Sequence, residues 1–123
     1  MTQDRRDFQR VECHRNATLS RTGELPETVR VQNVSLKGVL FDLPAGVTPP
    51  RPGEQARLRL ALNDEIRIEM SIEMLYCHHG HVGARWHQID VDSLVHLRQL
   101  IALNIGDAEQ VDEELAKVVK APS

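Results

Sequence analysis

Three short clusters of residues have side chains suited to binding a ligand. Arg6 and Arg10 form an R-x-x-x-R pattern near the N-terminus, directly after a further arginine, Arg5. Guanidinium groups bind phosphate through paired hydrogen bonds and lie flat on aromatic rings. An N-x-S-x-x-G pattern begins at Asn33, and a G-x-x-W pattern covers residues 83–86. Because each pattern alone is common, their order along the chain is the informative feature.

The composition limits what such a site would bind. The chain has 123 residues, of which 41% are hydrophobic and 27% charged, as expected for one folded domain. Its net charge is -3 and its pI about 6.0, whereas a general nucleic-acid binder is expected to be basic. The N-terminal arginines therefore suit a small anion better than a long polyanion. The chain has one Trp, one Tyr and two Phe residues, which is too few for the stacking surfaces of RNA-binding or single-strand-binding barrels.

The segments that must position these clusters alternate as β-strands do. Apolar side chains occupy every even position from Ile66 to Tyr76, and the odd positions between them are mostly charged or polar. Such a period of two indicates a strand with one buried face. Further strands are expected at residues 28–33, 38–43, 55–62 and 82–86. A succession of short strands without an intervening helix predicts a mainly β fold, either a small antiparallel sheet or a barrel.

Two helices are expected after the strands. Apolar residues recur with a helical period from Leu94 to Ile105. Asp92 or Ser93 is expected to cap the start of this helix, and Gly106 to follow its end. A second, weaker apolar stripe follows in an acidic segment, which is either a solvated face or a partner surface. The expected organisation within one domain is a flexible arm over residues 1–12, a β-barrel or sheet over 13–89 and helices over 90–120.

The N-terminus and the cysteines indicate a cytoplasmic protein. The first residues are charged and lack the apolar core of a signal peptide, and no apolar run approaches the ~18 residues of a membrane span. Cys13 and Cys77 are too few for a disulfide framework and form no C-x-x-C pair. The Cys-His-His-Gly-His run at residues 77–81 matches no zinc spacing, so a polar turn without metal is expected there. We therefore expect no membrane insertion and no metal site.

The arginine pattern and the N-x-S-x-x-G pattern, in this order and about 23 residues apart, resemble the two signatures of the PilZ domain family. Members of that family are receptors for the bacterial second messenger cyclic di-guanosine monophosphate (cyclic di-GMP). The resemblance extends from Arg5 to about Ile89. It implies a barrel of about six antiparallel strands with helices attached, a ligand rather than a cofactor, and no enzymatic activity. It also implies that signalling passes to a downstream protein partner.

The resemblance implies which residues bind the ligand. They are Arg5, Arg6, Arg10, Asn33, Ser35 and Gly38, and an arginine at the place of Arg5 tends to accompany a stacked ligand dimer in the family. An arginine fork matches guanine O6 and N7. Asn33 and Ser35 would face one side if their segment is extended. Asn33 has one acceptor oxygen where many members have Asp, so binding weaker than in those members is expected. Tyr76 is a further candidate, on chemical grounds, to stack on an exposed guanine.

Three other functions are alternatives to this prediction. The first is a PilZ-like adaptor that acts mainly by protein–protein interaction, with ligand binding weak or lost, which the Asn33 replacement leaves open. An enzyme, such as a hydrolase of the dinucleotide, is disfavoured because the chain offers no metal cluster and no paired acid and base. DNA or RNA binding is disfavoured by the net charge and the scarcity of aromatic residues.

Overall fold

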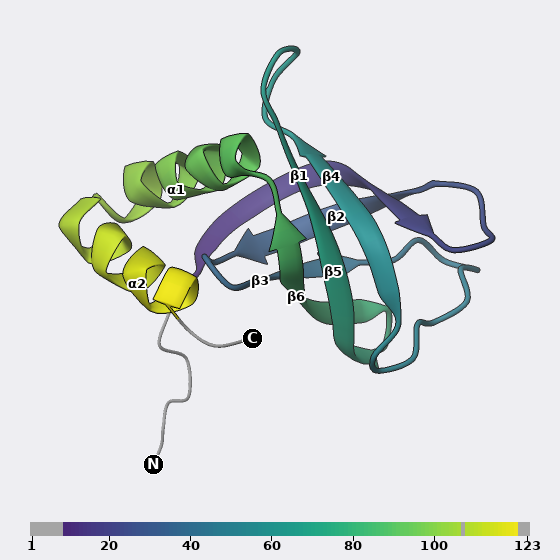
Figure 1. Ribbon diagram of the computed structural model, residues 1–123. Coiled ribbons are helices and arrows are strands. Elements are labelled where there is room, and N and C mark those ends of the chain that lie inside the picture. Colours follow the sequence, from purple (N-terminus) through teal and green to yellow (C-terminus); the bar gives the residue numbers. More distant parts are fainter. Residues whose placement is uncertain (1–8, 107, 121–123) are drawn as a thin grey trace.

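Six strands and two helices follow one another along the chain in the computed structural model, which describes residues 9–106 and 108–120 (Figure 1). Their bounds are β1 Val11–Arg21, β2 Glu27–Val34, β3 Gly38–Asp42, β4 Gln55–Ala61, β5 Arg67–His78, β6 His81–Ile89, α1 Val91–Ile105 and α2 Ala108–Lys120. The strands pair antiparallel and close into a barrel in the order β1-β2-β3-β6-β5-β4. The predicted mainly β fold with C-terminal helices is confirmed.

Two boundaries differ from the expectation. β1 begins at Val11, within the segment expected to be an arm. The cap of α1 was predicted wrongly, because Asp90 caps this helix in place of Asp92 or Ser93. The Asp90 carboxylate accepts a hydrogen bond from the Ser93 backbone N–H at 3.0 Å, and this bond lowers the pKa of Asp90. The Ser93 hydroxyl is buried and accepts a hydrogen bond from the Glu69 backbone N–H, which ties α1 to β5.

The two helices lie together at one end of the barrel (Figure 1). The end of α1 is as predicted, since Gly106 has a φ of 73° and donates its N–H to the Ala102 carbonyl. Arg98 of α1 donates two hydrogen bonds to the Asp112 carboxylate of α2, at 2.6 and 3.1 Å. Neither helix, in the part of the chain that is described, has the length and apolar character needed to cross a membrane.

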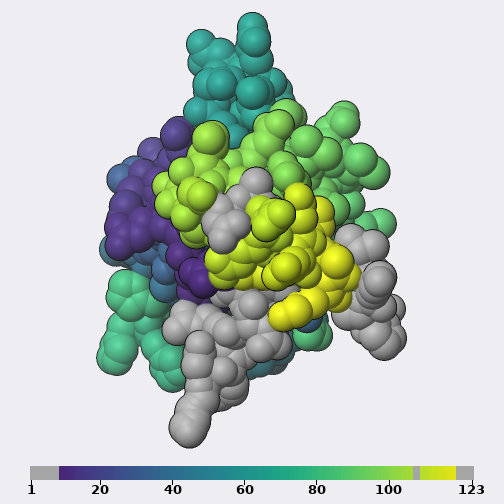
Figure 2. All heavy atoms as spheres, turned by 90° about the vertical axis from the view of Figure 1, so that its left-hand side faces the viewer, coloured from purple at the N-terminus to yellow at the C-terminus, as the bar shows by residue number. Residues whose placement is uncertain are grey.

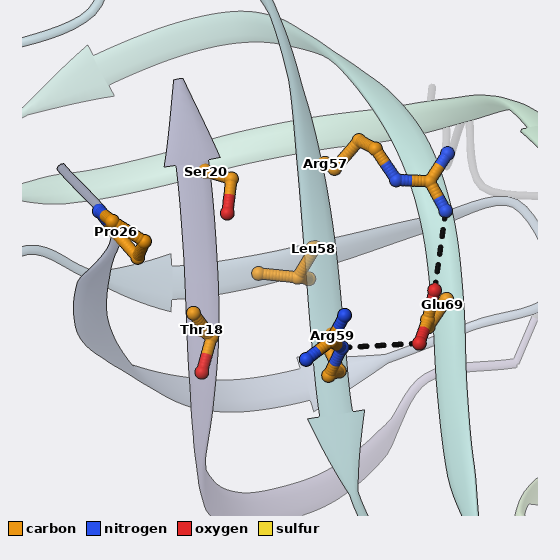
Figure 3. Close-up of a pocket in the computed structure, with 7 residues that line it drawn as sticks. All are labelled: Thr18, Ser20, Pro26, Arg57, Leu58, Arg59 and Glu69. Atoms are coloured by element: carbon orange, nitrogen blue, oxygen red, sulfur yellow. Dashed lines mark hydrogen bonds and ion pairs between the residues drawn. The ribbon is translucent and has the colours of Figure 1, made fainter. Parts of the chain in front are cut away.

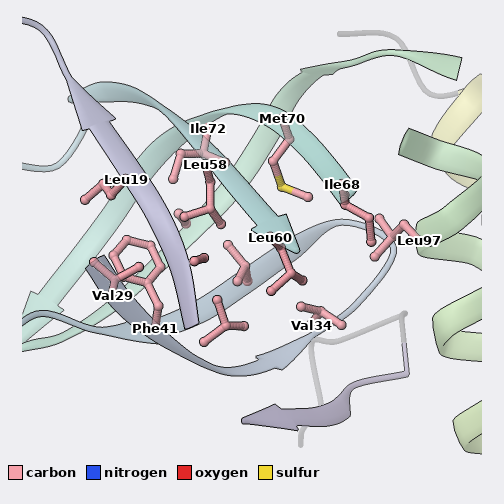
Figure 4. Packing of buried hydrophobic residues seen from close by; sticks show 14 of the residues in the cluster. Leu19, Val29, Val34, Phe41, Leu58, Leu60, Ile68, Met70, Ile72 and Leu97 are labelled. Atoms are coloured by element: carbon pink, nitrogen blue, oxygen red, sulfur yellow. The ribbon is translucent and has the colours of Figure 1, made fainter. Parts of the chain in front are cut away.

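The barrel is filled by the inward side chains of all six strands. Along β5 the even-numbered residues from Ile68 to Met74 are at most 4% exposed, as their alternation predicts. Phe41 is the largest fully buried side chain in this core. Figure 4 shows Leu97 of α1 next to Ile68, so that the core continues beneath the helix. This rigid apolar interior leaves the outer barrel surface as the place for a polar site.

A partly buried ion pair joins the end of β1 to the segment before β4. Arg21 is 7% exposed, and its guanidinium donates to both carboxylate oxygens of Glu54, at 2.7 and 3.1 Å. A third hydrogen bond runs from Arg21 to the Thr48 carbonyl at 2.7 Å. The hydrogen bond from Arg21 holds the pKa of Glu54 below its usual range and raises the pKa of Arg21 itself. Folding therefore favours the charged form of both side chains.

Replacing Glu54 with alanine is expected to lower the free energy of unfolding by about 3 kcal/mol, because the buried Arg21 guanidinium loses its carboxylate. Since folding lowers the pKa of Glu54, the stabilisation is present above the pKa of the unfolded chain and is lost as the pH falls through the folded value. Urea unfolding of the wild type and the variant at about pH 7 and about pH 3 measures both effects.

The matched control is Glu65→Ala, at an exposed glutamate in the β4–β5 turn. It should change the free energy of unfolding little at either pH. A difference between wild type and Glu54→Ala that stays the same in acid would show that the carboxylate charge is not what stabilises this end of the barrel.

Candidate functional site

The described part of the arginine pattern lies against the N-x-S-x-x-G segment. Arg10 directly precedes β1, whose first residue pairs with the last residue of β2. This pairing brings the Arg10 side chain to β2, where its Nη1 donates to Asn33 Oδ1 at 2.7 Å. Arg5 and Arg6 lie outside the described residues. The two patterns therefore meet on the outer surface of the barrel through Arg10 and Asn33.

A β-bulge turns the Asn33 side chain outward. Val29 and Val31 point into the barrel, and strict alternation would send Asn33 inward with them. The register of β2 against β3 shifts between Val31 and Asn33, which leaves Gln32 as the extra residue. An extra residue reverses the alternation, so that Val34 is buried and Asn33 is partly exposed. The bulge thus places an amide where Arg10 reaches it.

A second bulge has the same effect on Tyr76. The even-numbered residues of β5 point inward as far as Met74, and the register against β6 then shifts between Met74 and Tyr76. Leu75 is the extra residue, and Tyr76 is 43% exposed. Its ring covers Gly83 of β6, where a Cβ would overlap the ring atoms. The glycine therefore provides the space that the tyrosine ring occupies on the barrel surface.

Asn33 and Tyr76 belong to one row of residues across this surface. Asn33 pairs with Leu40 of β3, Leu40 with Gly83, and Gly83 with Tyr76. At a strand spacing of ~4.8 Å, the backbones at Asn33 and Gly83 are about 10 Å apart. The row carries a guanidinium and an amide at one end and an aromatic ring at the other. Such a surface can bind an anionic group and stack on a planar base at the same time.

The other residues of the N-x-S-x-x-G segment shape the turn between β2 and β3. β2 ends before Ser35, and Ser35 is buried whereas Asn33 is partly exposed. Ser35 is 4% exposed, and its Oγ accepts the backbone N–H groups of Lys37 and Gly38, both at 3.1 Å. A Cβ at Gly38 would overlap the carbonyl oxygen of Ala84 on β6. Both residues therefore act on the backbone of the hairpin.

Trp86 of the G-x-x-W pattern holds the same turn from β6. Its indole Nε1 donates to the Leu36 carbonyl at 2.8 Å, and its backbone N–H donates to the Lys37 carbonyl at 3.2 Å. These two bonds fix the turn that follows Asn33. Sequence reasoning missed this role because it depends on the pairing of β3 with β6, which no local pattern reveals.

Polar groups border the row on both sides. Asp42 accepts a hydrogen bond from Gln32 Nε2 at 2.7 Å and contacts His81 Nδ1. On the other side, Arg85 donates to Glu73 Oε1 at 3.0 Å. The register between β3 and β6 places these groups two residues to either side of the row. The row is therefore set in a polar, hydrogen-bonding surface rather than in an apolar patch.

A hollow on another part of the barrel does not contain the predicted residues. Figure 3 shows Arg57, Arg59 and Glu69 lining it on β4 and β5, together with Thr18 and Ser20 of β1. Glu69 accepts hydrogen bonds from both arginines, at 3.2 and 3.0 Å, and so offsets their charge. In the order of the closed barrel, β4 lies opposite β3. This hollow is therefore a useful control region for experiments on the Asn33 row.

Neither a cluster of metal ligands nor an activated Cys13 thiol is found among the described residues. They include no group of three or more His, Cys, Asp or Glu side chains that could hold a metal ion. The polar turn expected in residues 77–81 connects β5 and β6, with His79 at a φ of 51° and Gly80 at 81°. Burial raises the pKa of the Cys13 thiol, which disfavours the reactive thiolate.

A closed six-stranded barrel with an N-terminal arginine against its β2–β3 hairpin defines a class of small β-barrel domains with a polar surface site. The model of the PilZ domain family matches residues 4–103, which is most of the chain. The chain therefore belongs to the PilZ domain family. The match includes all three arginines of the N-terminal pattern and the Asn33 hairpin, and it ends before α2.

Solved structures share this fold at low sequence identity. The PilZ domain of YcgR from Escherichia coli, solved with c-di-GMP, has a TM-score of 0.65 and 12% identity over 96% of this chain and 100% of that chain. The PilZ domain of CeSA from a cellulose-synthesizing bacterium has a TM-score of 0.60 and 13% identity, covering 80% of this chain and 96% of that one.

A third structure belongs to a longer protein, the Bacillus subtilis inhibitor of motility MotI/DgrA. It has a TM-score of 0.66 and 18% identity, over 85% of this chain and 53% of that chain. This chain thus spans about half the length of MotI/DgrA. At these identities the three likenesses establish the fold.

Proposed function

We propose that this chain is a non-enzymatic receptor that binds cyclic di-GMP on the outer face of β2, β3 and β6. The main support for this proposal is the contact between Arg10 and Asn33. It joins the R-x-x-x-R and N-x-S-x-x-G patterns, which the family resemblance implies to bind the ligand. Membership of the PilZ family and the likeness to a domain solved with c-di-GMP support this choice of ligand. A bacterial, cytoplasmic setting fits this proposal.

The ligand chemistry matches the row from Asn33 to Tyr76. In the proposed complex, Arg10 and Arg6 bind phosphate oxygens and the O6 and N7 atoms of a guanine. Asn33 has one acceptor oxygen, which Arg10 already uses in the ligand-free chain, and an NH2 group that is able to donate. Ser35 and Gly38 act through the hairpin that holds Asn33 in place. Arg5 adds positive charge for a second, stacked ligand.

Ordering of the N-terminal arm around the ligand is the proposed signal. The arm and the barrel face would together form a surface that the ligand-free chain lacks, and a protein partner would recognise it. The second candidate is an adaptor that binds its partner with weak or no ligand binding. The likeness to the inhibitor of motility MotI/DgrA is the observation that favours it.

Isothermal titration calorimetry of the full chain with cyclic di-GMP separates the two candidates. The receptor proposal expects saturable heat with one or two ligands per chain, and loss of that heat in Arg6→Ala. Absence of heat, together with unchanged amide chemical shifts at excess ligand, would favour the adaptor.

Replacing Tyr76 with alanine is expected to weaken cyclic di-GMP binding about tenfold, because base–aromatic stacking is worth ~1–3 kcal/mol. Tyr76→Phe keeps the ring over Gly83 and should bind as the wild type does. The same calorimetric titration measures both variants. Equal affinity for Tyr76→Ala and the wild type would remove the tyrosine from the site while leaving the arginine contacts in place.

A further inference from the structure

Helix α2 has a carboxylate at a position where its helical pattern requires an apolar residue. The inward stripe of α2 consists of Val111, Glu114, Leu115 and Val118. Glu114 is 5% exposed, and it is one of four buried polar or charged residues among those described. Burying a carboxylate is costly unless hydrogen bonds compensate for the lost water. The location of Glu114 therefore calls for an explanation in terms of the groups it contacts.

The hydrogen bonds of Glu114 connect α2 to the N-terminal segment. Its Oε1 accepts the backbone N–H of Gln9 at 3.1 Å, across 105 residues of sequence, and its Oε2 accepts from Gln110 Nε2 at 3.3 Å. Gln9 lies within the R-x-x-x-R pattern and directly precedes Arg10. Figure 2 shows the purple start of β1 in contact with the yellow-green helix, and Figure 1 places the same two segments side by side.

Helix α2, which carries Glu114, is attached to the core and to α1. Val111, one turn earlier on the same face, is fully buried, and the Arg98–Asp112 pair binds α2 to α1. A carboxylate on this helix is thus a fixed acceptor for the backbone at Gln9. With the backbone held there, the next side chain, that of Arg10, reaches Asn33.

We propose that Glu114 is a positioning residue for ligand binding, which holds the N-terminal segment at Gln9 so that Arg10 is placed at Asn33 before the ligand arrives. This inference rests on the proposed function. It adds a residue on α2, beyond the 4–103 family match, to the machinery of the site. Preorganisation of this kind raises affinity by reducing the ordering cost of binding.

Glu114→Leu is the informative variant, because an apolar side chain of similar size suits the buried stripe and is expected to maintain stability. It removes the acceptor for Gln9. We expect amide exchange of Gln9 in the ligand-free chain to become about tenfold faster, because the amide loses one hydrogen bond to a charged group. We also expect cyclic di-GMP to bind about tenfold more weakly, since Arg10 is no longer held in place.

Two further variants complete the test. Glu114→Gln keeps an acceptor oxygen and should retain slow Gln9 exchange and most of the affinity. Glu113→Leu changes an exposed glutamate next to it and should alter neither. Unchanged Gln9 exchange in a folded Glu114→Leu chain overturns the proposal, as does wild-type affinity in that variant. If the wild type itself fails to bind cyclic di-GMP, the proposed function fails, and the exchange experiment without ligand still decides whether Glu114 holds the segment.

Discussion

Replacing Arg10 with alanine is expected to lower the affinity for cyclic di-GMP about 100-fold, which corresponds to ~2.7 kcal/mol. Hydrogen bonds to charged groups contribute ~1.5–3 kcal/mol each, and the guanidinium is proposed to bind both a phosphate and a guanine edge. Arg10 is exposed and lies just before β1, outside the buried core, so the fold should survive its removal. Calorimetric titration of the variant measures the loss directly.

The matched control for Arg10→Ala is Arg59→Ala. This variant changes the net charge by the same amount at an exposed arginine of β4, on the opposite side of the barrel from β3. It should bind cyclic di-GMP as the wild type does, apart from a small effect of overall charge that salt removes. Equal losses in the two variants would mean that the ligand responds to net charge rather than to the Arg10–Asn33 contact.

Gly38→Ala is expected to destabilise the chain by about 3 kcal/mol, because a backbone atom, unlike a side chain, cannot rotate away from the added methyl group. The added Cβ would overlap the Ala84 carbonyl oxygen, so β3 and β6 must separate at this point. Separation also moves the hairpin that holds Asn33, and ligand binding should fall with stability. Urea unfolding and calorimetry on the same preparation measure the two effects.

Gly83→Ala provides the comparison for Gly38→Ala on the neighbouring strand. Its Cβ would meet the Tyr76 ring, a side chain able to rotate away, rather than a backbone atom. We expect less than half the destabilisation of Gly38→Ala, with weaker ligand binding through the displaced ring. Similar losses of stability in both variants would contradict the view that the close approach of β3 to β6 is what requires Gly38.

Most of the strands and both helices were predictable from local patterns. The buried side chains of β5 obey the alternation from Ile68 to Met74, and Gly106 ends α1 as its position suggested. These features depend on neighbours in sequence, where period and capping preferences act directly. The cap at Asp90 was missed because three acidic or polar residues within four positions, Asp90, Asp92 and Ser93, can each serve as a cap. Packing against β5 decides among them.

The outward turn of Asn33 and Tyr76 was not predictable from alternation. By period alone, Asn33 would follow Val31 into the barrel, and Tyr76 would follow Met74. The extra residue of a bulge is defined only against its partner strand, so the sequence of one strand does not reveal it. The two bulges bring both side chains to one row of the surface, which makes them part of the candidate site.

The long-range contacts of the site were likewise not predictable from the sequence. Ser35 was expected to share a face with Asn33, whereas it is buried and its hydroxyl accepts two backbone N–H groups of the turn that ends at Gly38. The acidic second helix left a solvated face and a partner surface as alternatives, and the burial of Glu114 against Gln9 became visible only in the folded chain. Each depends on how segments distant in sequence pack together.

The most direct test of the account is an NMR titration of the isotope-labelled chain with cyclic di-GMP. We expect intermolecular contacts from the ligand to the side chains of Arg10 and Asn33, and slower amide exchange over residues 4–8 in the complex. Saturable binding whose contacts gather instead at Arg57 and Arg59, with Arg10 and Asn33 unchanged, would contradict it.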